Sequence, residues 1–237
     1  MICCFQMIAQ RFAANGDAML DHLGGFAQGE RVALYGVRTI GQLDVIVLLQ
    51  GADSAGGQRP QALVVTCSDS RMVPDLICQT DPGDLFVLRN AGNIVPPFTP
   101  GAAAAEAATI EYAVRGLGIR DIVICGHTRC GAMKAVMNPA DVAAMPRVRD
   151  WLGHAASAGE IVGTCYPHLP DDARWSVLVQ ENVLVQVENL RTHPVVAAGL
   201  AAGDLKIHAW VYKMETGQVF AYDPGSGQFG ELARHGG

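Results

Sequence analysis

Two short segments of the sequence carry side chains that can bind a metal or move a proton. In the first, Cys67, Asp69 and Arg71 alternate with serines, and in the second His127 precedes Cys130 by three positions. Zinc favours tetrahedral coordination by sulfur and nitrogen, and a catalytic zinc site has three protein ligands and one open position. The His-x-x-Cys spacing allows one turn to deliver two ligands, and a helix beginning beyond Cys130 would favour its thiolate. These residue types therefore point to a zinc site.

Each segment taken alone also has a plain structural explanation. A single cysteine at the end of a strand is usually a small buried hydrophobic residue. Asp69 and Arg71 are equally compatible with a surface ion pair of little energetic value. A structural zinc site usually has four ligands in pairs, whereas this sequence contains no Cys-x-x-Cys. The residues by themselves leave a catalytic metal site and ordinary packing both open.

The two segments need secondary structure that brings them together. Short apolar runs rich in β-branched residues predict buried parallel strands, at 62–66, 85–88 and 122–125. The last of these is expected to end at Gly126. Apolar periodicity and proline placement predict helices, over about 102–115, from about 131, over 174–190 and from Pro194. Residues 205–212 and 218–222 flank Glu-Thr-Gly and predict a terminal hairpin.

The alternation of strands and helices predicts an α/β fold, with a central mainly parallel β-sheet, an antiparallel edge strand and flanking helices. Apolar residues at helical spacing in 1–30 predict an N-terminal helical arm over 1–50. A single zinc-binding α/β domain is expected over 51–237. Functional residues of such sheets lie beyond the carboxyl ends of the strands, and Cys67 and His127 both fall at that position.

Composition limits the classes of protein to which the chain can belong. Half of its 237 residues are hydrophobic and 17% are charged, which supports a large core and argues against disorder. The net charge of −6 and the absence of a Lys/Arg run argue against nucleic acid as a partner. No apolar run is long enough to span a membrane and the N-terminus lacks a basic leader, so we expect a cytoplasmic protein. Seven cysteines cannot all pair internally, which favours burial or metal binding.

The order and spacing of the motifs resemble the β-class carbonic anhydrases over nearly all of residues 50–222. The family's Cys-x-Asp-x-Arg matches the first segment, and its Gly-His-x-x-Cys-Gly matches residues 126–131. Between them, residues 82–93 are similar to the family's Gly-Asp-x-Phe-x-x-Arg-Asn segment. Further similar segments lie at 111–114, 181–183 and 210–212.

This resemblance implies a zinc enzyme that reversibly hydrates carbon dioxide to bicarbonate and a proton by way of zinc-bound hydroxide. It implies one Zn²⁺ per chain, and the implied ligands are Cys67, His127 and Cys130. Asp69 and Arg71 would form the catalytic dyad. The positions that match the family's substrate pocket are Gln58, Phe86, Ala91 and Tyr112. In the family some of this lining comes from a neighbouring subunit, so the resemblance also implies a homodimer or homotetramer, with the N-terminal helices wrapped around the partner.

Two other functions fit the same ligands. One is a related zinc hydrolase that acts on carbon disulfide or carbonyl sulfide, because these are linear molecules like carbon dioxide. The other is a non-catalytic zinc-binding relative, against which the intact Asp69, Arg71 and Gln58 argue. Residues 139–172 are the least periodic part of the chain, with one helix expected around Trp151, and no role is assigned to them.

Some members of the family have a closed state, in which the aspartate becomes the fourth zinc ligand. They also bind bicarbonate at a second pocket that includes a tryptophan three residues before the first zinc cysteine. Here that position is Val64, and the proline that follows the arginine is Pro74, one residue later than in those members. We therefore expect the open, non-allosteric subtype, in which Asp69 pairs with Arg71.

Overall fold

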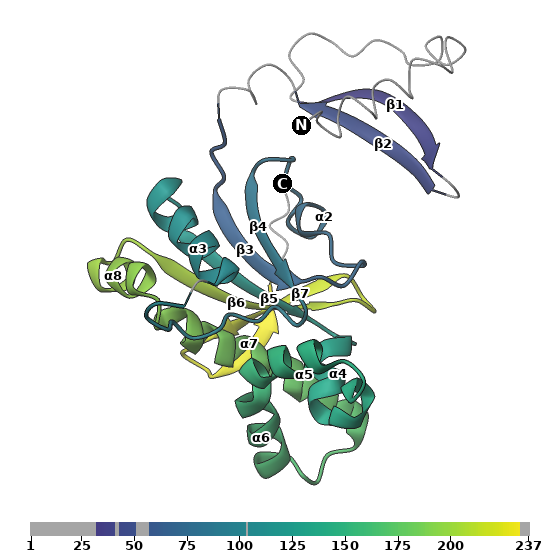
Figure 1. Cartoon of the computed structure of the whole chain (residues 1–237), viewed down its shortest axis with the longest axis vertical. Helices are drawn as coiled ribbons and strands as arrows, with labels where there is room; N and C mark the ends of the chain where they lie inside the picture. Colours follow the sequence, from purple (N-terminus) through teal and green to yellow (C-terminus); the bar gives the residue numbers. More distant parts are fainter. Residues whose placement is uncertain (1–31, 41–42, 51–56, 103, 233–237) are drawn as a thin grey trace. The chain divides into compact units, whose positions relative to one another are not determined.

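The chain divides into two compact units, residues 1–57 and 58–237. The computed structural model describes residues 32–40, 43–50, 57–102 and 104–232 (Figure 1). In the first unit, β1 (Val32–Ile40) and β2 (Leu43–Gln50) form an antiparallel pair. Both are rich in β-branched residues, which favour strands. The helical arm expected over 1–50 therefore does not extend into these strands, and the helix expected over 1–30 lies outside the described residues.

The second unit is built on a six-stranded sheet with the order β4-β3-β5-β6-β7-β8. Its strands are β3 (Ala62–Cys67), β4 (Leu85–Asn90), β5 (Asp121–His127), β6 (Lys206–Lys213), β7 (Gln218–Asp223) and β8 (Gln228–Glu231). The first four strands in the order are parallel to their neighbours, and β7 and β8 are antiparallel. This confirms the mainly parallel sheet with an antiparallel edge. Strand β8 was not expected, because four residues with one large apolar side chain give too short a pattern.

Helices of very different lengths accompany the sheet. The helices are α2 (Pro74–Cys78), α3 (Ala105–Glu111), α4 (Gly131–Met137), α5 (Pro146–Leu152), α6 (Ala156–Cys165), α7 (Asp171–Arg191) and α8 (Pro194–Ala202). Helix α3 continues as a π-helical turn at Tyr112–Gly116. Figure 1 shows α4, α5 and α6 grouped beside the long α7. None of the helices in the described part of the chain is long and apolar enough to cross a membrane.

Two apolar clusters hold the sheet in place. The larger one joins α7 to the central strands through side chains that are fully buried, including Val65, Ile122, Ile124, Leu178 and Leu190. The smaller one lies on the alternate positions of the strands and contains Val64, Met72, Val123 and Cys125. Because both faces of β3 and β5 are buried, these strands are continuous apolar runs rather than alternating ones.

Gly126 does not end strand β5, contrary to the expectation. The strand continues to His127, and Gly126 and His127 pair with Val211 and Tyr212 of β6. A Cβ atom on Gly126 would lie 2.7 Å from Cγ2 of Val183 on α7. Glycine is therefore needed here for the close approach of helix and sheet.

Candidate metal centre

Strands β3 and β5 bring two of the three predicted ligands to the same edge of the sheet. Cys67 is the last residue of β3 and His127 the last of the neighbouring parallel strand β5. Cys130 follows in the next turn, directly before α4. The sulfur atoms of Cys67 and Cys130 are 4.0 Å apart. All three side chains are buried, and their ligand atoms lie within 4.8 Å of one another.

The geometry of this cluster fits zinc. Two sulfurs that are each about 2.3 Å from a tetrahedral zinc lie about 3.8 Å apart, close to the separation seen here. Nδ1 of His127 lies 2.9 Å from the carbonyl oxygen of Thr128, which can accept a hydrogen bond from it. Nε2 of His127 is buried and has no hydrogen-bond partner among the described residues. A buried nitrogen lone pair beside two sulfurs is what a missing cation would satisfy.

The two cysteines differ in their affinity for a proton. The pKa of Cys67 lies below its ordinary value, mainly because Cys130 donates a hydrogen bond to it, and the backbone N–H of Gly92 donates another. The pKa of Cys130 lies above its ordinary value, because its thiol donates a hydrogen bond to Cys67 and because it is buried. A divalent cation would bind both sulfurs as thiolates and so release their protons.

Asp69 and Arg71 form a bidentate pair beside the cluster. Nε of Arg71 donates to Oδ1 of Asp69 at 2.9 Å, and Nη2 donates to Oδ2 at 2.7 Å. The side chain of Asp69 is 18% exposed, and Oδ2 lies 4.0 Å from Nε2 of His127. The hydrogen bonds from Arg71 hold the pKa of Asp69 well below its usual range. Asp69 is therefore an ionised carboxylate fixed next to the position of the metal.

Arg89 is a residue of this site that the sequence did not single out. It lies on β4, where it is next to β3 in the sheet. Its Nε donates to the carbonyl oxygen of Cys67 at 3.1 Å, and its Nη2 donates to that of Asp69 at 2.7 Å. Arg89 thus fixes the backbone that carries one ligand and the carboxylate. Its place in the segment 82–93 was a signal, but the spacing alone gave it no role.

The turn between His127 and Cys130 is held by side chains far away in the sequence. Arg129 has a φ of +59°, a left-handed conformation that is unusual for a residue with a side chain. Its guanidinium pairs with Asp172 at 3.1 Å and with Glu215 at 3.3 Å. Glu215 also accepts a 2.6 Å hydrogen bond from the hydroxyl of Thr128. These contacts stabilise the turn that places two ligands, and no local pattern predicts them.

The four expected lining positions do not come together within one chain. Ala91 follows Asn90, the partner of Cys67 in the sheet, and so lies beside the metal centre. Phe86 pairs with Leu63, four residues before Cys67, which is about 13 Å along a strand.

Tyr112 and Gln58 also lie away from the cluster. The ring of Tyr112 is 6.0 Å from that of Phe86, and Tyr112 is 51% exposed. Gln58 is exposed and precedes β3, whose opposite end carries Cys67. Of the four positions, Ala91 alone lies near the cluster of Cys67, His127 and Cys130 in its own chain.

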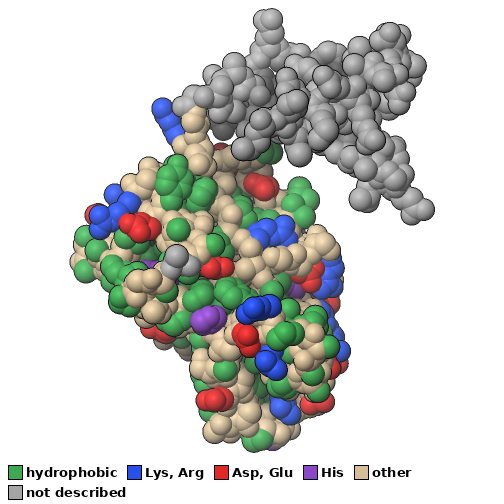
Figure 2. Space-filling view, in the orientation of Figure 1, with side chains coloured by type: hydrophobic (Ala, Val, Ile, Leu, Met, Phe, Trp, Pro, Cys, Tyr) green, Lys and Arg blue, Asp and Glu red, His purple; other side chains and the backbone are tan. Residues whose placement is uncertain are grey.

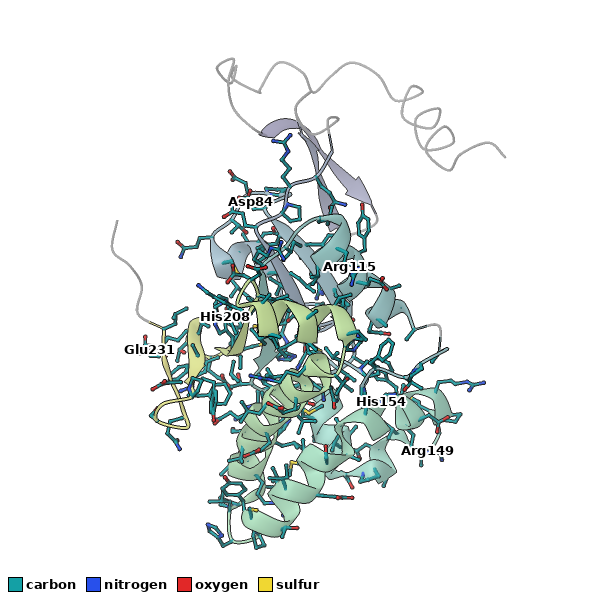
Figure 3. All side chains as sticks on the ribbon, turned by 90° about the vertical axis from the view of Figure 1, so that its left-hand side faces the viewer. Asp84, Arg115, Arg149, His154, His208 and Glu231 are labelled. Atoms are coloured by element: carbon teal, nitrogen blue, oxygen red, sulfur yellow. The ribbon has the colours of Figure 1, made fainter. Side chains whose placement is uncertain are left out.

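Charged side chains of both signs are mixed over the face in Figure 2. Away from the metal centre lies His208 on β6, which is labelled in Figure 3. Its Nε2 is 2.8 Å from Oδ1 of Asp121 at the start of β5. That pair is at the end of β5 opposite to His127 and takes no part in the cluster.

Comparison with known proteins supports the same assignment. A family model described as carbonic anhydrase matches residues 62–219. A carbonic anhydrase of Pseudomonas aeruginosa is 48% identical over 178 residues, which are 75% of this chain and 80% of the relative. The structure of the β-carbonic anhydrase CcaA is similar with a TM-score of 0.73 and 42% identity, covering 76% of this chain and 87% of the other.

One of two tetrameric β-carbonic anhydrases from Sordaria macrospora is also similar in structure. The match has a TM-score of 0.61 and 29% identity, and it covers 76% of this chain and 84% of the other. The matched family model spans both ligand segments and the strands that carry them. The chain therefore belongs to the β-class carbonic anhydrases, which are lyases.

Proposed function

We propose that the chain hydrates carbon dioxide reversibly, to bicarbonate and a proton, at one zinc ion held by Cys67, His127 and Cys130. The observation that carries this proposal is the buried Nε2 of His127, which has no partner among the described residues and lies beside two sulfurs 4.0 Å apart. When bound, zinc supplies a Lewis acid that makes hydroxide available near neutral pH.

The residues around the metal direct this chemistry. Asp69 would accept a hydrogen bond from the attacking hydroxide and so turn an oxygen lone pair toward the carbon of the substrate. Arg71 keeps the carboxylate ionised and fixed, because a bidentate pair restrains both of its oxygens. The backbone at Ala91 forms the wall next to Cys67, and its methyl side chain suits an apolar gas.

We assign the rest of the substrate lining to a neighbouring subunit. Strand β4 is at the edge of the sheet and carries Phe86 away from its own metal centre. Tyr112 beside it is half exposed, which leaves its ring available to a second copy of the chain. Gln58 is exposed at the same end of the sheet. A homodimer, or a tetramer as in the Sordaria macrospora relatives, would bring these side chains to the partner's zinc.

We also propose the open subtype for this chain. Both oxygens of Asp69 accept hydrogen bonds from Arg71, so coordination of a metal by Asp69 would break a bidentate pair. Val64 lies buried in the smaller apolar cluster, and its side chain offers no N–H group with which to hold a second anion. A ligand that favours a closed state therefore has no binding group at this position.

The experiment is metal analysis of the purified protein together with stopped-flow hydration of carbon dioxide. About one zinc per chain and fast hydration are expected, and the Cys130→Ser variant should lose both. Carbon disulfide and carbonyl sulfide are assayed in parallel. Faster turnover of either compound would identify it, rather than carbon dioxide, as the substrate. Bound zinc without turnover of any of the three would indicate a non-catalytic relative.

A further inference from the structure

One peptide group connects an indole to a proposed metal ligand. The carbonyl oxygen of Ala91 accepts a hydrogen bond from Nε1 of Trp151 at 2.8 Å. The N–H of the same peptide group, which belongs to Gly92, donates to Sγ of Cys67 at 3.4 Å. Trp151 lies on α5, between Arg149 and His154 in the sequence, both of which are labelled in Figure 3. A tryptophan of the least periodic segment thus reaches the thiol through two hydrogen bonds.

The position of this peptide group is strongly constrained. Gly92 has a φ of +86°, and a Cβ atom there would lie 3.1 Å from Cβ of Ala132 and 3.2 Å from Cε of Met133. Its own carbonyl oxygen accepts a 3.0 Å hydrogen bond from Nδ2 of the buried Asn182. Glycine therefore permits the approach to Cys67, while Asn182 and Trp151 fix the two adjacent carbonyl groups.

Hydrogen bonds at the two ends of a peptide group strengthen one another. A donor at the carbonyl oxygen withdraws electron density from the amide, which makes its N–H a better donor. An N–H that donates to a thiolate withdraws charge from the sulfur. Two thiolates cancel the formal charge of a zinc ion, so a less electron-rich sulfur leaves the ion a stronger Lewis acid.

We propose that Trp151 is a positioning residue of the metal centre, which orients and polarises the Ala91–Gly92 peptide group so that its N–H withdraws charge from the thiolate of Cys67. This inference rests on the proposed function, because it takes Cys67 to be a metal ligand. It gives a role to α5, and it explains why the indole N–H of Trp151 donates to the carbonyl oxygen of Ala91, which lies next to Cys67.

The test replaces zinc with Co²⁺ and records the sulfur-to-cobalt charge-transfer absorption. Trp151→Phe keeps an aromatic ring and loses the N–H. We expect this variant to bind Co²⁺, with the absorption shifted to lower energy because the sulfur is more electron-rich. The pH midpoint of carbon dioxide hydration by its zinc form should shift upward.

Trp210→Phe is the matched control. Trp210 packs beside the smaller apolar cluster, and its indole N–H has no hydrogen-bond partner among the described residues. Its spectrum and pH profile should match those of the wild type. An unshifted spectrum and profile for Trp151→Phe would overturn the inference.

A second variant separates loss of the indole N–H from loss of the fold. The replacement of Trp151 by β-(3-benzothienyl)alanine keeps the shape of the indole and substitutes sulfur for the N–H group, so the same shifts are expected. Identical spectra for this protein and the wild type would also overturn the inference. The wild-type spectrum separates the two proposals, because a wild type without thiolate-to-cobalt absorption contradicts the metal centre itself.

Discussion

Oδ2 of Asp69 lies 4.0 Å from Nε2 of His127 and accepts a 2.7 Å hydrogen bond from Nη2 of Arg71. The carboxylate is therefore a neighbour of the proposed metal ligand, yet both of its oxygens are engaged by a guanidinium. This arrangement keeps the carboxylate of Asp69 beside the proposed metal position while its oxygens are bound to Arg71 rather than to the metal. Its proposed task is to orient the attacking oxygen.

Loss of this carboxylate should separate metal binding from turnover. Asp69→Ala should keep about one zinc per chain, while kcat for hydration falls by a factor on the order of 10² or more, as expected for a positioned acid–base group. Arg71→Ala should behave in the same way, because an unpaired carboxylate is free to swing toward the metal. The exposed Asp204 offers a control, and Asp204→Ala should match the wild type. Wild-type turnover in Asp69→Ala would remove the dyad from the mechanism.

The open subtype makes a prediction about coordination. In crystals of the zinc-loaded protein grown at about pH 8, Asp69 should remain paired with Arg71. A carboxylate that binds zinc lies about 2.0–2.2 Å from the ion. An Asp69 oxygen at that distance would show a closed state and contradict the prediction. Added bicarbonate should leave the pairing unchanged.

The Asp69–Arg71 pair should also be visible in the acid stability of the metal-free protein. Because the pKa of Asp69 is lowered by Arg71, its ionised form stabilises the fold fully above about pH 4, the pKa in an unfolded chain. That contribution is lost as the pH falls toward the folded-state pKa. The urea midpoint of the wild type should therefore fall more between about pH 5 and about pH 2 than that of Asp69→Asn. An equal fall of the urea midpoint with pH in the two proteins would argue against a stabilising Asp69–Arg71 pair.

Shared lining predicts complementation between two defective chains. Asp69→Asn damages the dyad, and the double variant Phe86→Ala and Tyr112→Ala damages the lining. In a mixed dimer, the site of the ring-less chain has its own intact dyad. The Asp69→Asn chain supplies the intact rings of Phe86 and Tyr112 to that site. Refolding the two proteins together should raise the hydration rate above the mean of the separate proteins. If the rings act within their own chain, the mixture will give only that mean.

The close approach at Gly126 predicts a rescue. Gly126→Ala places a methyl group 2.7 Å from Cγ2 of Val183, and such overpacking destabilises by about 1–3 kcal/mol. Val183→Ala removes the clashing atom. In urea unfolding, Gly126→Ala should destabilise the Val183→Ala background less than it destabilises the wild type. Equal effects in both backgrounds would show that this contact does not determine the need for glycine.

The parts of the fold that local pattern determines could be predicted from the sequence. The runs at 62–66, 85–88 and 122–125 became β3, β4 and β5, because strands buried on both faces need uninterrupted apolar residues. The end of β5 was wrong, since the role of Gly126 depends on Val183, which belongs to a distant helix. The expected arm over 1–50 rested on the helical spacing of residues 1–30, which carries no information about the strands β1 and β2 that follow.

In the candidate metal centre too, local sequence pattern predicted some residues and distant contacts determine the others. The three ligand positions were predicted by motif and spacing, and the structure brings their side chains together. The partners of those ligands could not be predicted in this way. Glu215 meets Arg129, and Trp151 meets Ala91, only because the chain folds back over long separations. Contacts of this kind leave no periodic signal, so the supporting residues of a site are harder to find than its ligands.

The pairing of β3 with β5 has a consequence for how the protein acquires its metal. Cys67 and His127 are delivered by adjacent parallel strands whose interiors are already packed with apolar side chains. The coordination pocket is therefore a product of folding rather than its cause, in contrast to small zinc fingers that collapse only around their ion. A chelator should accordingly remove the zinc while the chain stays folded. Simple addition of zinc should then refill the site without a chaperone or a refolding step. In a cell short of zinc, such chains would persist as an intact, inactive reserve.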